Sequence, residues 1–252
     1  MVQIVAILNS KGGSGKTSSA VNLAAALGEG RRRRVLVVDL DPQGSASAWL
    51  GTPGGKVGLS DVLQGSGMLP ILDTSAPGVE LVPADSSLVG IGERGLAPAD
   101  AARHLRAALA NLPPLWDIIL LDTPPTLNAL TLAALVVAGH AIIPTEASAM
   151  ALAGVGSTVT TLGKAREAIN PGLRLAGILL CRMDARTAVS RAALAGLSAE
   201  YGRQVFKATI RESARLRAAP LFQKPITTYA PTSTAAADYR AAAAELRRRL
   251  AR

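Results

Sequence analysis

A short loop rich in glycine and lysine, set between an apolar segment and an alanine-rich one, constrains the fold more than any other feature of this sequence. The apolar segment is Val2–Leu8, the loop reads Lys11-Gly12-Gly13-Ser14-Gly15-Lys16-Thr17-Ser18, and the helix-forming stretch is Gly15–Gly28. Glycines let the loop backbone wrap closely, so that its N–H groups and the N-terminus of the next helix point at phosphate oxygens. In such a loop Lys16 neutralises phosphate charge and the Thr17 hydroxyl ligates magnesium. The sequence therefore predicts a phosphate-binding site formed by these eight loop residues.

Apolar runs rich in Val, Ile and Leu alternate with longer Ala/Leu-rich segments along the chain. The runs are apolar on both faces, which is typical of strands in a buried parallel sheet. Alternating strands and helices predict an α/β fold, a three-layer doubly wound domain with a mainly parallel sheet. No repeat or linker divides the chain, so residues 1–252 are predicted to form a single domain. The predicted strands are Val2–Leu8, Val35–Val38, Val79–Val82, Ile118–Leu121, Ala141–Ile143 and Leu173–Leu180, and the predicted helices are Gly15–Gly28, Ala99–Ala110, Leu127–Ala138, Leu152–Ile169 and Ala188–Ala199.

Two further segments have a less regular or a more polar pattern. Gly51–Ala76 is rich in Gly, Pro and Ser, which predicts surface loops with a short helix near Leu59–Leu63. The last helix is expected to start near Thr232-Ser233 and to run to the end of the chain. Its apolar stripe is expected to pack on the sheet, and it consists of Tyr239, Ala243, Leu246 and Leu250.

Carboxylates stand at the ends of two predicted strands. Asp122 follows Ile118–Leu121, where it can hold a magnesium-bound water beside the phosphates. Asp39 and Asp41 close the strand Val35–Val38, and side-chain alternation places both on one side of that strand. Either of the two can reach the metal shell or the attacking water, and the pattern alone does not assign their roles.

The net charge of +9 is unevenly distributed along the chain. Residues 1–181 hold 13 basic and 13 acidic side chains, whereas residues 182–252 hold 14 basic and 5 acidic ones. A basic end predicts a surface for a polyanion, and the alternative is a solvated face in a composition biased to Ala and Arg. The chain has only 2 Trp, 3 Tyr and 2 Phe, which disfavours stacking on single-stranded bases and favours contact with backbone phosphates.

The sequence also argues against several classes of site. Cys181 is the only cysteine, which excludes an intramolecular disulfide and any metal centre built from several cysteines of one chain, and a reducing cytoplasm is expected. The longest apolar stretch, Ala129–Pro144, is shorter than the roughly 18 residues that a membrane span needs. We therefore expect no membrane-spanning segment.

Taken together, these motifs resemble those of the ParA/MinD group of P-loop ATPases. Lys11–Thr17 is similar to the group's deviant Walker A motif, which carries an additional signature lysine. Val35–Gly44 resembles the second-strand motif, and Asp117–Pro125 resembles the Walker B strand. The resemblance continues through Leu180–Thr187 and Arg215–Pro220, so it covers nearly the whole chain. The most similar subgroup is that of the short, Soj-like ParA proteins, which partition chromosomes or plasmids.

The chain departs from the family pattern in the loop and near the predicted adenine contacts. Ser10 stands where a strict P-loop pattern has glycine, and Ser14 and Ser18 stand where the common pattern has Val and Thr. The segment 210–213 reads Ile-Arg-Glu-Ser where Soj-like sequences commonly read Ile-Pro-Arg-Asn. The family proline there helps to frame the adenine, so the resemblance does not assign the base contacts.

The resemblance implies a magnesium- and ATP-dependent switch. Water positioning is implied for Asp41 and a supporting magnesium role for Asp39, so the expected catalytic residues are Lys11, Lys16 and Asp41, and the expected magnesium residues are Thr17, Asp39 and Asp122. Lys11 is expected to reach across a nucleotide-sandwiched homodimer to the partner's phosphates. The apo and ADP forms would then be monomeric, the ATP form dimeric, and a ParB-like protein would stimulate a slow ATPase.

The family also binds double-stranded DNA without sequence preference when dimeric, which implies a role in chromosome or plasmid segregation and a place on the nucleoid. A ParA-like positioner of another cargo, such as carboxysomes or chemoreceptor clusters, is the first alternative. A MinD-like division-site regulator is the second, although its usual amphipathic membrane-targeting end is poorly matched by the Arg/Ala end here, and we expect no membrane partner. The predicted DNA-binding residues are Arg186, Arg211, Arg215, Arg217 and Lys224.

Overall fold

The computed structural model describes residues 2–31, 34–52, 58–93 and 96–251, and a seven-stranded sheet forms its centre. The strand order is β3-β4-β2-β5-β1-β6-β7, and the pairs are parallel except for β3 with β4. All six predicted strands are present, with ends shifted by a few residues. The short β3 lies in the Gly/Pro/Ser-rich segment and consists of two exposed residues, so no apolar run in the sequence predicted it. The strands are β1 (Gln3–Ile7), β2 (Val35–Asp39), β3 (Leu72–Asp73), β4 (Val79–Val82), β5 (Ile118–Asp122), β6 (His140–Glu146) and β7 (Arg174–Cys181).

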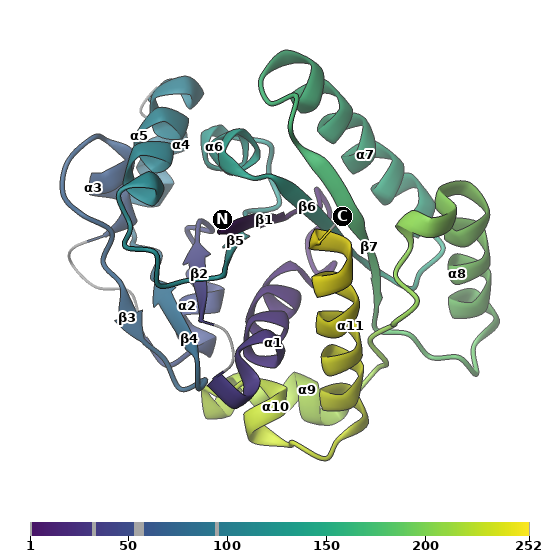
Figure 1. The fold of residues 1–252 in the computed structure, drawn as a ribbon. Coiled ribbons are helices and arrows are strands. Elements are labelled where there is room, and N and C mark those ends of the chain that lie inside the picture. The colour runs from purple at the N-terminus through teal and green to yellow at the C-terminus, as the bar shows by residue number, and fades with distance from the viewer. Residues whose placement is uncertain (1, 32–33, 53–57, 94–95, 252) are drawn as a thin grey trace.

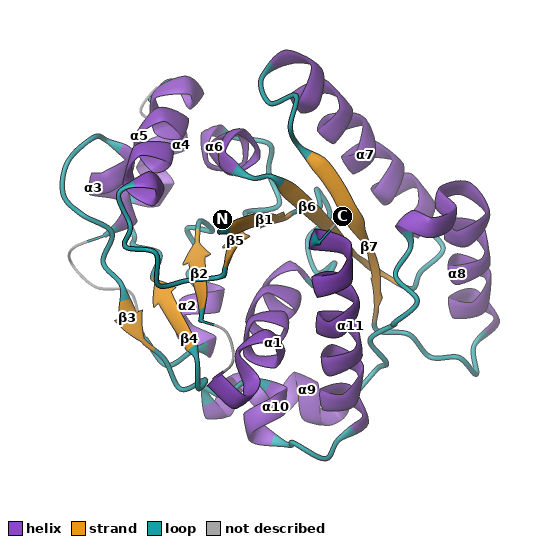
Figure 2. Ribbon diagram, viewed as in Figure 1, coloured by secondary structure: helices purple, strands orange, loops and turns teal. Residues whose placement is uncertain are grey.

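Helices cover both faces of the sheet and complete the three layers that the sequence predicts (Figures 1 and 2). Side-chain alternation divides the strands between two apolar clusters, with Ala6 in one and Val5 and Ile7 in the other. One cluster is covered by α3 (Leu59–Leu63), α4 (Leu88–Glu93), α5 (Pro98–Ala110), α6 (Ala129–Val137), α7 (Ala151–Ala168) and α8 (Ala188–Tyr201). The other is covered by α1 (Lys16–Gly28), α2 (Ser45–Trp49), α9 (Ala214–Ala218), α10 (Ile226–Tyr229) and α11 (Thr234–Leu250).

The last helix, α11, packs its predicted apolar stripe against α1 and β7, with Tyr239 and Leu246 buried. Two acidic residues of α11 also hold the chain that follows α8. Glu245 accepts hydrogen bonds from the backbone N–H groups of Lys207 and Ala208, and Asp238 accepts one from Arg211. The basic end of the sequence is therefore a packed part of the domain. Within the described residues, none of the helices is both long enough and apolar enough to cross a membrane.

The carboxyl ends of the central strands bring the sequence motifs together. Asp39 of β2 lies in register with Asp122 of β5, which in turn lies in register with Ile7 of β1. The glycine-rich loop leaves β1 at this edge and leads into α1 at Lys16. In doubly wound sheets, ligands bind outside the carboxyl ends of the strands. The fold therefore places the loop and both aspartates at the position where such sheets bind their ligands.

Candidate functional site

Glycine is required in the loop both for its backbone conformation and for space. Gly13 and Gly15 have φ angles of +74° and +95°, in the left-handed region that other residues rarely adopt. A Cβ atom on Gly15 would lie 3.3 Å from the Cys181 sulfur, which packs under the loop. Asn9 fixes the start of the loop, because its Nδ2 donates to the Pro144 carbonyl and its Oδ1 accepts from the Lys11 N–H. Contacts with β6 and β7 thus fix the position of the loop.

The two loop lysines occupy different environments. Lys16 is buried, and its Nζ donates to the carbonyl of Lys11 at 3.3 Å. Burial lowers the pKa of Lys16, and the carboxylates of Asp122 and Asp41 oppose that shift. The Lys11 side chain is 43% exposed and its Nζ lies 3.6 Å from Glu146 Oε2. Lys16 therefore faces the interior of the site, whereas Lys11 lies on its rim.

Asp39 is fully buried and is bonded by its own chain. Its Oδ2 accepts hydrogen bonds from the N–H and the hydroxyl of Ser47, at 2.8 and 2.7 Å, and its Oδ1 accepts from the Asp41 N–H. Burial raises the pKa of Asp39 to about 6, although the Ser47 hydrogen bonds act in the opposite direction. Asp39 consequently fixes the position of α2, which begins two residues before Ser47.

Asp122 is also fully buried, but neither of its carboxylate oxygens has a hydrogen-bond partner within the described residues. Burial raises the pKa of Asp122 well above its usual value, the neighbouring Asp39 adds to this, and the Thr17 hydroxyl opposes it. Native structures seldom leave buried carboxylates unpaired. These oxygens, beside a threonine hydroxyl, fit a hydrated magnesium ion.

Magnesium also agrees with the small number of protein ligands at this edge of the sheet. The described part of the chain contains no group of three or more His, Cys, Asp or Glu side chains able to hold a metal. Magnesium does not need such a group, because it keeps several waters and is usually bound by one or two carboxylates together with substrate phosphates. The donors that the sequence predicts, Thr17 and Asp122, meet this requirement, with Asp39 next to them.

A cleft of about 690 Å³ opens beside the loop, within the range of about 300–1,000 Å³ common for ligand sites. Asp41 lies half-buried in its wall, and the carboxylate of Asp41 accepts a hydrogen bond from the Gln43 N–H. Sequence reasoning missed the opposite wall. Of the sequence motifs, only the segment Arg215–Pro220 reaches that wall, at Pro220. The wall brings together residues of α2 and of the turn after α9: Ser45, Ala48, Trp49, Pro220, Leu221 and Gln223.

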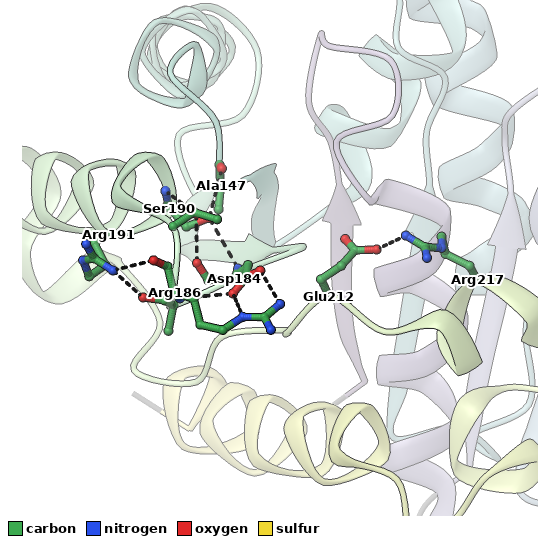
Figure 3. Close-up of polar contacts among 9 residues, drawn as sticks. Ala147, Asp184, Arg186, Ser190, Arg191, Glu212 and Arg217 are labelled. Atoms are coloured by element: carbon green, nitrogen blue, oxygen red, sulfur yellow. Dashed lines mark hydrogen bonds and ion pairs between the residues drawn. The ribbon is translucent and has the colours of Figure 1, made fainter.

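The five predicted DNA-binding residues fall into two groups. Three are bound to carboxylates of their own chain: Arg186 to Asp184, Arg211 to Asp238 and Arg217 to Glu212. Figure 3 shows the first and the last of these pairs. Arg215 and Lys224 are exposed, and the described residues offer neither of them an ion-pair partner. The structure thus separates two uncommitted cations from three that are already paired.

An ion-pair chain that the sequence did not predict links the glycine-rich loop to this basic region. Glu146 pairs with Lys11 and, at 3.1 Å, with Arg182. Arg182 also pairs with Glu212 at 3.2 Å, and Glu212 binds Arg217. A continuous chain of ion pairs therefore connects Lys11, on the rim of the cleft, with Arg217 in the basic region.

Comparisons with known proteins agree with this geometry. A family model described as an AAA domain matches residues 2–175. The chromosome-partitioning ATPase Soj of Thermus thermophilus is 42% identical over 249 residues, covering 99% of this chain and 97% of that protein. The chromosome partitioning protein ParA of Caulobacter vibrioides is 36% identical over 241 residues, covering 90% of this chain and 87% of that protein. A Mycobacterium smegmatis structure named cobyrinic acid a,c-diamide synthase, with a bound ATP analogue and magnesium, is 34% identical with a TM-score of 0.78, covering 88% of this chain and 93% of that one.

Proposed function

Because the chain belongs to the Soj/ParA family of chromosome-partitioning ATPases, we propose that it is an ATP-dependent switch that dimerises, binds DNA and drives chromosome or plasmid segregation. ATP and Mg²⁺ are its cofactors, a ParB-like protein is its stimulating partner, and it acts in the cytoplasm on the nucleoid. The observation that carries the proposal is the unpaired carboxylate of Asp122, which lies beside Thr17 and the buried Lys16.

In this proposal the predicted site residues have separate tasks. The loop N–H groups of residues 12–18 and the ammonium of Lys16 hold the phosphates. Thr17 and Asp122 would hold the magnesium ion, with Asp39 supporting them, and the ion would supply charge neutralisation for the phosphates. Asp41, at the mouth of the cleft, orients the attacking water. Such a site needs positioning and charge neutralisation more than covalent chemistry, which agrees with a slow ATPase that waits for a partner.

Nucleotide-gated DNA binding is the first expected result. A long non-specific duplex should bind the protein with ATP or a non-hydrolysable analogue and bind it far less with ADP or no nucleotide, because a dimer doubles the number of phosphate contacts. Binding should weaken steeply between two salt concentrations, since each phosphate contact releases counterions. A filter or anisotropy titration in all four nucleotide states measures this. Affinity that ignores the nucleotide would contradict the switch.

The ion pairs predict which cations contribute most to that binding. Arg215→Ala and Lys224→Ala are each expected to reduce the slope of log affinity against log salt by about 0.9 per contact, because both side chains are free to reach phosphates. Arg186→Ala removes an equally exposed cation that is already paired with Asp184, so it is the matched control with a smaller effect. Equal losses in all three variants would show that the intramolecular pair does not restrain Arg186.

The name of the M. smegmatis neighbour supports a second candidate, an amide-forming enzyme that uses ATP. Such an enzyme should hydrolyse ATP faster when its small-molecule acid and nitrogen donor are present, and DNA should have no effect. A ParA-like function predicts the reverse, since DNA and a ParB-like protein should be the stimulating partners. Phosphate release measured with each addition separates the two. A positioner of another cargo shares the DNA response, and its cargo would be found by co-purification.

A further inference from the structure

The turn that carries Lys224 is hydrogen-bonded to α2, the helix that follows β2 and Asp41. We call residues 219–226 the bridging segment. The indole Nε1 of Trp49, the last residue of α2, donates to the carbonyl of Lys224 at 2.9 Å. The Ser75 hydroxyl donates to the carbonyl of Gln223 at 2.5 Å. Trp49 is buried, and its hydrogen bond to the bridging segment is partly buried.

The same helix is bonded to Asp39 through Ser47, its middle residue. The hydroxyl and N–H of Ser47 both donate to Asp39 Oδ2. The Ser47 hydroxyl oxygen also accepts a hydrogen bond from the Ala84 N–H at 3.0 Å. Because Ser47 and Trp49 are two residues apart in the five-residue helix α2, we expect a shift of Ser47 to move Trp49. One short element therefore connects a carboxylate at the magnesium position with the backbone of Lys224.

A second connection joins the bridging segment to α1, the helix that follows the glycine-rich loop. The buried side chain of Asn22 accepts a hydrogen bond from the Ile226 N–H at 2.7 Å. Its amide nitrogen donates to the carbonyl of Ser18, in the first turn of α1, at 2.8 Å. The bridging segment is thus attached on one side to α2, which is bonded to Asp39, and on the other to α1, which begins with Lys16 and Thr17.

The residue directly before these two attachments has an unfavourable backbone conformation. Gln223 has a φ angle of +52°, in the left-handed region that residues other than glycine seldom adopt. Gln223 lines the cleft, and the next residue is the exposed Lys224. Strained backbone of this kind persists where the surrounding contacts hold it, and it clusters at ligand clamps and switch regions.

We propose that Trp49 is a positioning residue that transmits the state of the nucleotide cleft to the basic residue Lys224 through the bridging segment. This inference rests on the proposed function, because it concerns how ATP gates the binding of polyanions. Asp39 would shift Ser47 and α2 when the cleft is occupied, and the Trp49 indole would carry that movement to the Lys224 backbone. By linkage, DNA must then tighten the binding of the ATP analogue by the same factor.

Trp49→Phe tests the proposal, because it keeps an aromatic ring in the packed site and removes the N–H donor. Trp116→Phe is the matched control: that indole donates to Glu80, near the amino ends of the strands. The quantity to measure is the ratio of DNA affinities with a non-hydrolysable ATP analogue and with ADP. We expect Trp49→Phe to reduce this ratio by about fivefold or more and Trp116→Phe to leave it at the wild-type value. Equal ratios in the two variants would overturn the proposal.

Two further readouts distinguish this coupling from a direct role of Trp49 in holding the nucleotide. With only two tryptophans in the chain, Trp116→Phe leaves Trp49 as the sole reporter, and its emission should change when the ATP analogue binds. Unchanged emission at saturating analogue would overturn the proposal even if Trp49→Phe failed to fold. Loss of nucleotide affinity in Trp49→Phe without DNA, by the same factor as the ratio, would assign Trp49 to the nucleotide pocket instead. A wild-type ratio of one would overturn the proposed function as well, whereas a gated wild type with an unaffected Trp49→Phe overturns the coupling alone.

Discussion

Replacing Lys11 with alanine is expected to abolish ATP-dependent dimers while leaving much of the nucleotide binding by a single subunit. Lys11 lies on the rim, where its ammonium is 3.6 Å from Glu146 and 43% of its side chain is exposed. Such exposed ion pairs contribute only about 0–1 kcal/mol, so Lys11 can leave Glu146 for a partner's phosphate at little cost. Losing one partner of a buried charge pair at the dimer interface should weaken dimerisation roughly 100-fold.

Sizing by ultracentrifugation with a non-hydrolysable ATP analogue measures this effect. Lys164→Ala, which removes an exposed lysine on α7, is the matched control and should dimerise as the wild type does. Lys16→Ala should behave differently from both, because its buried ammonium faces the cleft and its loss should remove nucleotide binding along with the dimer. Normal dimers of the Lys11 variant would show that the rim lysine does not cross the interface.

The positions of the glycine-rich loop and of the two strand-end aspartates were predictable because their signals are local. A glycine-rich loop between a strand and a helix, and a carboxylate directly after a buried strand, each occupy a few consecutive residues. Parallel strands then align Asp39 with Asp122 without any further information. The position of the site at the carboxyl ends of the strands follows from the same regularity.

The features that escaped prediction depend on contacts between distant segments. The pairing of Lys11 with Glu146 and the hydrogen bond from Trp49 to Lys224 arise only when separate β/α units meet. Composition showed that the last 71 residues hold the whole net charge, but it does not reveal that Arg211 is bound by Asp238. Charge along a sequence therefore predicts that a basic surface exists, while the ion pairs determine which of its cations remain available.

Because the carboxylate of Asp122 is unpaired, we expect its replacement to raise the stability of the protein and to lower its activity. Asp122→Asn removes a buried carboxylate whose oxygens have no hydrogen-bond partner within the described residues, and burying a carboxylate without hydrogen bonds is costly even with Lys16 nearby. Without magnesium and nucleotide we therefore expect the variant to be about 1 kcal/mol more stable to unfolding than the wild type.

ATP hydrolysis by the Asp122→Asn variant should fall on the order of 100-fold, because the amide supplies no negative charge for magnesium. The stabilisation that Mg-ATP gives the folded protein should shrink with it, since that gain depends on the binding affinity. Thermal unfolding with and without Mg-ATP, together with phosphate release, measures both effects. Asp73→Asn, at an exposed position on β3, is the control that should change neither. A variant that is less stable than the wild type and still hydrolyses ATP would mean that Asp122 serves the fold and not the metal. The expected combination, greater stability with lost activity, would identify Asp122 as a residue kept at a cost in stability for the sake of its ligand.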